Sequence, residues 1–195
     1  MTELDALRQR CLQCTACPLA RTRNKVVFGV GSAPSDIVFV GEGPGQQEDL
    51  TGEPFVGAAG QLLDEMLSII DLGRHNCYIC NIVKCRPPQN RDPMPEEQDA
   101  CIGYLQEQLR LLQPKIVVCL GRIAAMRLIT PDFRITREHG QWTRRDGVSY
   151  MAIYHPSALL RDVSKRPETF SDLLSLREQA KALGCRQYES KIIRV

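Results

Sequence analysis

Four short apolar runs, separated by segments with helical periodicity, are the feature that most limits how this chain can fold. The runs cover residues 36–40, 77–83, 115–120 and 150–154. Apolar side chains recur at helical spacing in the segments between and after them, which predicts helices over residues 59–71, 95–112, 122–129 and 158–184. Strands that alternate with helices form a mainly parallel sheet covered on both faces. The sequence therefore predicts an α/β fold.

Polar residues follow three of these predicted strands. Residues 42–48 follow the first strand, Asn81 lies near the end of the second, and His155 comes directly after the fourth. Parallel sheets bind ligands outside the carboxyl ends of their strands, so we expect these three segments to meet in one cleft. A single histidine after a strand is more often structural than functional. His155 rises above that expectation because two other strand ends converge on it.

The loop after the first strand is rich in glycine and carries two carboxylates, Glu42 and Glu48. Its glycines allow backbone N–H groups to approach a ring or a phosphate closely. The loop lacks both the spacing of a dinucleotide-binding loop and the lysine of a P-loop, so a nucleotide cofactor is weakly supported. Carboxylates in an open loop favour acid–base chemistry or the positioning of water, against the alternative of a solvated turn.

Nine cysteines in a chain whose first residues lack the character of a secretion signal favour metal, catalytic or buried thiols over a disulfide framework. Cys14 and Cys17 form a CxxC pair in an N-terminal loop, and Cys85 and Cys101 follow much later. Four such thiolates can enclose a [4Fe–4S] cluster. The same four could hold zinc, so the ligands alone leave the metal open.

Other cysteines compete for these roles. Residues 3–24 are predicted to form a short helix followed by the cysteine-bearing loop. Cys11 also precedes Cys14 at CxxC spacing, but it lies one helical turn before that loop and is interpreted as a packed or partly exposed thiol. Cys77 and Cys80 fall in a predicted strand, where positions three apart point to opposite faces, which disfavours a shared ion or a redox pair. Cys101 lies on the apolar stripe of its helix and, taken alone, is more typical of the core than of a ligand.

Charge gives little indication of function. The net charge is +2, with 25 Lys and Arg against 23 Asp and Glu. Basic residues gather locally at 84–91, 134–145 and 161–166, but charge alone favours solvated surface residues. No apolar run approaches the length of a membrane span, so we expect an intracellular, cytoplasmic protein away from the membrane. We also expect a nucleoid-associated monomer.

Taken together, several segments resemble the family 4 uracil-DNA glycosylases. The matching segments are Gly41-Glu42-Gly43-Pro44-Gly45 with Glu48, Gly52-Glu53-Pro54-Phe55-Val56-Gly57, Asn81 to Pro88, Asn90-Arg91-Asp92-Pro93 and His155-Pro156-Ser157. Each motif is weak alone, but their order, their spacing and the four thiols make the resemblance specific from about Cys14 to about Arg161.

The resemblance implies a three-layer α/β/α sandwich with a central four-stranded, mainly parallel sheet. It implies one domain over residues 1–195, with a flexible tail over 186–195. It also implies a structural [4Fe–4S] cluster on Cys14, Cys17, Cys85 and Cys101, which would pack the N-terminal segment 1–24 on that domain.

The implied substrate is uracil-containing DNA, from which the base is flipped out and its N-glycosidic bond hydrolysed. By similarity, Phe55 stacks on uracil, Asn81 reads its Watson–Crick edge and His155 stabilises the leaving group. Glu42 positions water or stabilises the sugar cation. At the next position this chain has Gly43, where better-known superfamily members carry an aspartate.

The remaining implied roles concern the pocket wall and the DNA. The loop glycines Gly41, Gly43 and Gly45 line the pocket, and Glu48 with Gly45 borders uracil C5. The segment after the histidine wedges into the duplex or contacts it, through Ser157, Leu159, Leu160 and Arg161. Arg91 is a further DNA contact. The alternative hypothesis is a non-catalytic nucleic-acid-binding module with a structural metal centre, which would not require Phe55, Asn81 and His155 together.

Overall fold

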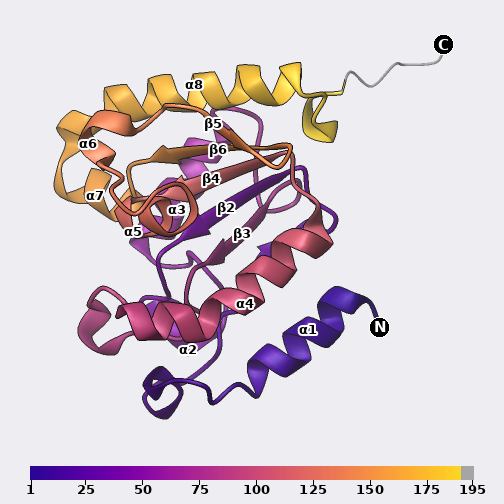
Figure 1. Ribbon diagram of the computed structural model, residues 1–195. Coiled ribbons are helices and arrows are strands. Elements are labelled where there is room, and N and C mark those ends of the chain that lie inside the picture. Colours follow the sequence, from indigo (N-terminus) through magenta and orange to yellow (C-terminus); the bar gives the residue numbers. More distant parts are fainter. Residues whose placement is uncertain (190–195) are drawn as a thin grey trace.

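A six-stranded sheet forms the centre of the computed structural model, which describes residues 1–189 (Figure 1). The strand order is β1-β3-β2-β4-β6-β5. The strands are β1 (Val30–Gly31), β2 (Ile37–Gly41), β3 (Tyr78–Asn81), β4 (Ile116–Leu120), β5 (Thr143–Arg145) and β6 (Val148–Ile153).

The four central strands are parallel and correspond to the four apolar runs of the sequence. β2 pairs with β3 on one side and with β4 on the other, and β4 pairs with β6. Their apolar residues are buried on both faces, as expected for strands covered by helices. The predicted α/β fold with a parallel four-stranded core is therefore confirmed.

Two short antiparallel strands extend the sheet beyond the four that were predicted. β1 pairs with β3 at one edge, and β5 pairs with β6 at the other. Neither carries an apolar run, because an edge strand of two or three residues is mostly exposed. β5 and β6 are joined at Asp146 and Gly147, which both have positive φ, as a two-residue type I′ hairpin turn requires.

Helices cover both faces of the sheet. They are α1 (Glu3–Leu12), α2 (Gln46–Thr51), α3 (Ala58–Ser68), α4 (Pro95–Leu112), α5 (Arg122–Leu128), α6 (Ile135–Glu138), α7 (Pro156–Arg161) and α8 (Arg166–Ala182). Short 3-10 turns are η1 (Pro18–Arg21), η2 (Pro88–Asn90), η3 (Val163–Lys165) and η4 (Arg186–Tyr188). Figure 1 shows α8 along one face, with α4 and α1 along the other. None of the helices in residues 1–189 is both long enough and apolar enough to span a membrane.

The sheet separates two hydrophobic cores. One contains residues of α1, α4 and α5, and the other contains residues of α3, α7 and α8. Cys80 belongs to the first core and Cys77 to the second, so these two thiols lie on opposite sides of the sheet as predicted. Cys119 of β4 is also a core residue.

The two ends of the described chain are tied to this framework. Leu7 and Cys11 of α1 are buried in the core that α4 shares. In the predicted tail, Arg186 donates from its backbone N to Asp36 Oδ2 at 2.8 Å and from Nε to the same oxygen at 3.0 Å. Residues 190–195 of that tail lie outside the described residues.

Candidate active site

A cleft of about 620 Å³ lies at the carboxyl ends of the parallel strands. Its walls come from the loop after β2, the 55–59 segment, the end of β3, the 87–92 loop, the start of α5 and the start of α7. The predicted convergence of Glu42, Asn81 and His155 is therefore confirmed. Gly43, Gly45, Glu48, Phe55, Arg91, Ser157 and Arg161 also line the cleft.

Asn81 ends β3 at the floor of the cleft, where it is only 1% exposed. Its carbonyl oxygen Oδ1 is buried and has no hydrogen-bond partner among the described residues. Leaving such an acceptor unpaired costs about 1–3 kcal/mol, so its retention indicates that a donor arrives with a ligand. Gly41 is the register partner of Asn81 on β2, and a Cβ at Gly41 would lie 2.4 Å from Oδ1. The missing side chain leaves room for the amide.

Phe55 lies above this floor in a left-handed backbone conformation with φ of 55°. Two groups hold the strained segment. Arg74 donates to the carbonyl oxygens of Pro54, at 2.8 Å, and of Phe55. On the other side, Glu48 Oε1 accepts from the backbone N of the two residues after Phe55, at 2.8 and 2.9 Å. The backbone that carries the ring is thus fixed by side chains outside its own loop.

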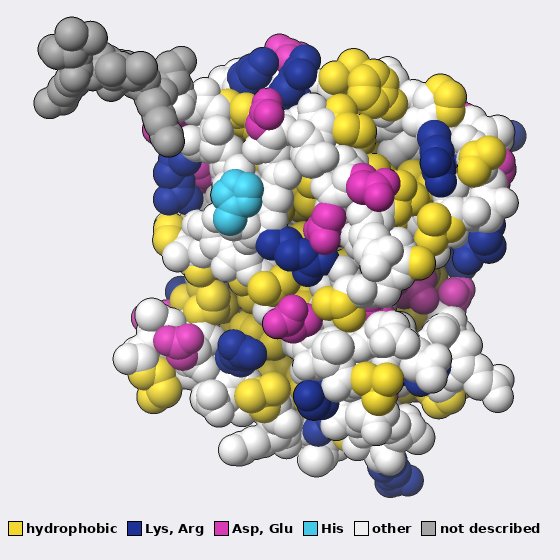
Figure 2. Space-filling view, turned by 180° about the vertical axis from the view of Figure 1, so that it is seen from behind, with side chains coloured by type: hydrophobic (Ala, Val, Ile, Leu, Met, Phe, Trp, Pro, Cys, Tyr) yellow, Lys and Arg dark blue, Asp and Glu magenta, His cyan; other side chains and the backbone are white. Residues whose placement is uncertain are grey.

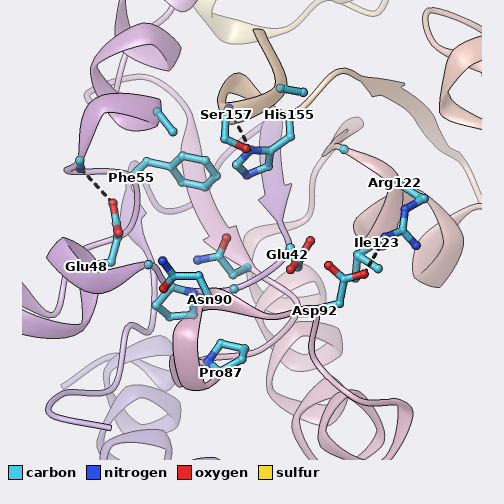
Figure 3. A pocket seen from close by; sticks show the side chains of 18 of the residues that line it. Glu42, Glu48, Phe55, Pro87, Asn90, Asp92, Arg122, Ile123, His155 and Ser157 are labelled. Carbon is cyan, nitrogen blue, oxygen red and sulfur yellow. Dashed lines mark hydrogen bonds and ion pairs between the residues drawn. The ribbon is translucent and has the colours of Figure 1, made fainter. Parts of the chain in front are cut away.

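His155 caps the N-terminus of α7 beside Phe55. Its Nδ1 accepts from the backbone N of Ser157 at 3.1 Å and lies 2.7 Å from the Ser157 hydroxyl. The Phe55 and His155 ring centroids are 5.7 Å apart with a tilt of 33° between the rings, and Figure 3 shows the two rings side by side. Burial lowers the pKa of His155 to about 4, and the charge of Arg161 adds to this effect. A neutral ring whose Nδ1 accepts from a backbone N–H carries its proton on Nε2.

Glu42 lies on the side of the cleft closest to α5, near Asp92 and Arg122 (Figure 3). Burial raises the pKa of Glu42 to about 7, and the negative charge of Asp92 raises it further, while Arg122 opposes the shift. Arg122 Nη2 pairs with Asp92 Oδ2 at 2.6 Å. A carboxylate with this pKa can accept a proton near neutral pH.

Several residues predicted to contact DNA lie in different environments. Leu160 is 44% exposed, but Leu159 is 1% exposed and packs in the core between the sheet and α8. The Arg91 guanidinium forms a bidentate pair with the buried Glu97, with distances of 2.9 and 2.7 Å. On the face seen in Figure 2, basic and acidic side chains alternate and form no continuous basic field.

Five cysteines line a second, much smaller cavity between the N-terminal segment, the loop after β3 and α4. They are Cys11, Cys14, Cys17, Cys85 and Cys101. Cys11 is buried in the core, which confirms the prediction of a packed thiol, and it also lines this cavity. The cavity wall carries no histidine and no carboxylate. None of the described cysteines forms a disulfide.

The donors around these sulfurs fit an anionic iron–sulfur group. Arg23 Nη1 donates to Cys85 Sγ at 3.3 Å, and the Lys84 backbone N donates to Cys101 Sγ at 3.3 Å. Hydrogen bonds to sulfur and cysteine-only ligation are typical of iron–sulfur sites. Within residues 1–189, no three His, Cys, Asp or Glu side chains converge as they would around one ion.

Sequence reasoning missed the residues that hold the functional side chains in place. Arg74, Arg122 and Gln108 carried no signal, because each acts on a segment distant in sequence. Asp92 lies in the Asn90–Pro93 motif, but the sequence indicated no role for this residue. Gly121 was also missed; glycine is required there because a Cβ would lie 2.8 Å from His155 Cβ.

Comparison with known proteins agrees with this geometry. A family model described as the uracil DNA glycosylase superfamily matches residues 28–176. A type-4 uracil-DNA glycosylase of Archaeoglobus fulgidus is 46% identical over 188 residues, which cover 91% of this chain and 94% of the relative. Type-4 enzymes of Thermotoga maritima and Sulfurisphaera tokodaii are 45% and 38% identical, covering 83% and 92% of this chain and 85% and 86% of the relatives.

Proposed function

The chain belongs to the uracil-DNA glycosylase superfamily as a type-4 enzyme that removes uracil from DNA by hydrolysing its N-glycosidic bond, and we propose how its cleft performs this reaction. The observation that carries the proposal is the unpartnered Asn81 Oδ1 at the floor of the cleft, below Phe55 and His155. A base inside a duplex cannot reach such a floor, so the nucleotide must leave the stack first.

Asn81 reads the extruded base. Its Oδ1 accepts from uracil N3–H and its Nδ2 donates to uracil O4. Cytosine presents an acceptor at N3 and an amine at C4, so the same amide orientation opposes two of its groups. The burial of Asn81 supports this discrimination, because a mismatched polar group there has no water to replace the lost bond.

Phe55 stacks on the uracil ring, and Glu48 with Gly45 borders the C5 position. A Cβ at Gly45 would lie 2.7 Å from Glu48 Oε2, which supports close contact between the loop backbone and this carboxylate. Because Glu48 is anchored by two backbone N–H groups, the wall cannot easily withdraw from the methyl group of thymine. Thymine is therefore excluded by shape.

His155 stabilises the leaving group. As the N1–C1′ bond breaks, its electron pair passes to uracil and negative charge develops on O2. The Nε2–H of the neutral imidazole donates to that oxygen, and Ser157 holds the ring through Nδ1. A preorganised donor of this kind contributes about 10²–10³ in rate.

Glu42 acts on the attacking water. In its ionised form it accepts a proton from the water as the oxygen bonds to C1′, which leaves an abasic site. The uracil anion takes up a proton at N1 from solvent to give free uracil, and Glu42 returns its proton to solvent. Its raised pKa, caused mainly by burial, suits a base that works near neutral pH. Asp92 and Arg122 set the charge around it.

DNA contacts surround the cleft mouth. The exposed Leu160 fills the gap left by the flipped base, while Ser157 and Arg161 contact the backbone. Leu159 supports this segment from the core. Arg91 orders the adjacent loop through its ion pair with Glu97, and it also lines the cleft, where its remaining N–H donors can contact DNA.

A [4Fe–4S] cluster would be held by Cys14, Cys17, Cys85 and Cys101, with Cys11 as a neighbouring thiol. When bound, its irons would bond the four cysteine thiolates and so cross-link the N-terminal segment, the loop after β3 and α4. The protein residues of the cleft carry the reaction, and the cysteine site fixes the loop that follows Asn81.

The test is excision from a labelled oligonucleotide that contains one uracil. The proposal predicts release of free uracil and alkali-sensitive cleavage at that position alone. A matched oligonucleotide with thymine or cytosine at the same position should stay intact. A uracil strand that remains intact would favour the alternative of a non-catalytic binding module.

A further inference from the structure

Lys84 is a buried lysine between the base-reading end of β3 and the cysteine cavity. It is 1% exposed. Its ammonium Nζ donates to the backbone carbonyl of Asn81 at 2.8 Å and to Gln108 Oε1 at 2.6 Å. Both acceptors are neutral oxygens. Burying an ammonium costs several kcal/mol unless opposite charge or strong acceptors compensate it, which makes this position informative.

Gln108 of α4 is itself fully buried and uses both ends of its amide. Its Oε1 accepts from Lys84, and its Nε2 donates to the Phe28 carbonyl at 2.9 Å and to the Tyr78 hydroxyl at 3.3 Å. The side chain therefore cannot rotate without breaking bonds in the core. Through this fixed amide, Lys84 holds the Asn81 backbone against α4.

The other side of Lys84 is the cysteine site. Its backbone N donates to Cys101 Sγ, Cys85 is its sequence neighbour, and Lys84 lines the same cavity. The wall of that cavity lacks carboxylates, so the negative charge near the ammonium would come from cysteine thiolates. A cluster with four thiolates carries net negative charge, which a buried cation stabilises.

We infer that Lys84 is a positioning residue that joins the two sites. Its ammonium is the counter-charge of the cysteine-bound cluster. Its hydrogen bond to the backbone carbonyl of Asn81 fixes the position of the base-reading side-chain amide. This inference rests on the proposed function of Asn81 and on the proposed cluster. It assigns to the segment between the two sites the role of linking them, because one side chain contacts the Asn81 backbone and Gln108 and also lines the cysteine cavity.

The test compares K84M with K115M. K84M keeps the side-chain length and removes the charge, and K115M removes a half-exposed lysine that lies outside the cleft and the cysteine cavity. Both are purified anaerobically with the wild type. Three quantities are measured: iron per chain, the dissociation constant of free uracil, and the reduction potential of the cluster. None of these requires catalysis.

K84M should bind free uracil roughly tenfold more weakly, as loss of one charged hydrogen bond predicts. Its cluster should have a lower reduction potential, because a nearby positive charge favours the reduced, more negative state. K115M should match the wild type in both. Wild-type uracil binding by K84M, or an unchanged potential, would overturn the inference. If K84M does not fold, K84Q replaces it with the same expected directions.

The controls separate this inference from the proposed function. A wild-type protein that neither binds nor excises uracil would contradict the function of the cleft itself. A wild-type protein without iron after anaerobic purification would contradict the cluster. An active, iron-containing wild type with an unaffected K84M contradicts only the role of Lys84.

Discussion

Gly41 and Asn81 are register partners on adjacent parallel strands. A Cβ on Gly41 would lie 2.4 Å from the side-chain oxygen Oδ1 of Asn81 and 2.6 Å from the tip of the Phe55 ring. The pocket floor therefore exists because one strand end lacks a side chain. Gly41→Ala should displace the amide or the ring and reduce uracil excision roughly ten- to a hundredfold, the value of one bidentate base contact. Single-turnover kinetics measure this effect.

Gly103→Ala is the matched control for that substitution. Gly103 lies on the exposed side of α4, and an added Cβ meets nothing within 4 Å. Excision should be unchanged, and the free energy of unfolding should rise by about 0.5–1 kcal/mol because alanine favours helix. Equal activity of both alanine variants would mean that Gly41 does not shape the pocket.

Asn81→Asp tests base reading directly. The aspartate loses the donor to uracil O4 and presents an additional acceptor to the amine of cytosine. We expect roughly tenfold or greater loss of uracil excision, with weak activity on cytosine appearing. Parallel assays on uracil- and cytosine-containing strands measure both effects. Full uracil activity in this variant is the result that the proposed role does not allow.

The pH profile tests the charges around Glu42. Since the pKa of Glu42 is raised to about 7 and only its ionised form accepts a proton, kcat/KM should fall as pH drops below about 7. This fall is the acidic limb of the pH profile. His155 stays neutral down to about pH 4, so its titration does not contribute to that limb. Glu42→Gln should lower the rate by about 10²–10⁴ and abolish the limb.

Asp92 and Arg122 should move that limb in opposite directions. Asp92 raises the pKa of Glu42, so Asp92→Asn should shift the limb to lower pH. Arg122 lowers the pKa, so Arg122→Met should shift the limb to higher pH. Shifts of the same sign in both variants would show that the limb belongs to another group.

Leu159 and Leu160 are adjacent leucines with different predicted roles. Leu160→Ala should reduce excision from double-stranded DNA more than from single strands, without a change in Tm, because the exposed side chain only fills the vacated stack. Leu159→Ala should lower the free energy of unfolding by about 2–5 kcal/mol, because it opens a cavity in the core. Thermal melting and paired-substrate assays distinguish the two.

The cysteine ligands can be separated in the same way. Cys101→Ser should lose iron and acid-labile sulfide, because sulfur ligation at that corner is removed. Cys119→Ser, in the core of β4, should retain both. Cys11→Ser should also retain iron if the four ligands are Cys14, Cys17, Cys85 and Cys101. Loss of iron in Cys11→Ser but not in Cys101→Ser would reassign the fourth ligand.

The apolar runs were sufficient to predict the four parallel strands, because strands buried on both faces leave a continuous signal. The two edge strands had no such signal, since Val30–Gly31 and Thr143–Arg145 are short and mostly exposed. Helix α2 was missed for a related reason: its six residues fall in a segment that reads as a glycine-rich loop.

The functional residues were more visible than the residues that hold them. Asn81 and His155 could be predicted because each follows a strand that the sequence reveals. Arg74 and Lys84 could not, since their partners at Phe55 and Gln108 become neighbours only after folding. Leu159 and Leu160 show the limit within one segment, because the register of a short helix decides which leucine faces the core.

The most direct test of the cleft is uracil release by the purified protein and by His155→Ala. The wild type should release uracil from a single-uracil oligonucleotide, leaving one site that alkali cleaves. His155→Ala should be slower by roughly 10²–10³ while still binding free uracil, because the lost donor acts mainly on the developing charge. Equal rates for the two proteins, or an uncleaved wild-type product, would contradict the assignment of this cleft as a uracil-excising site.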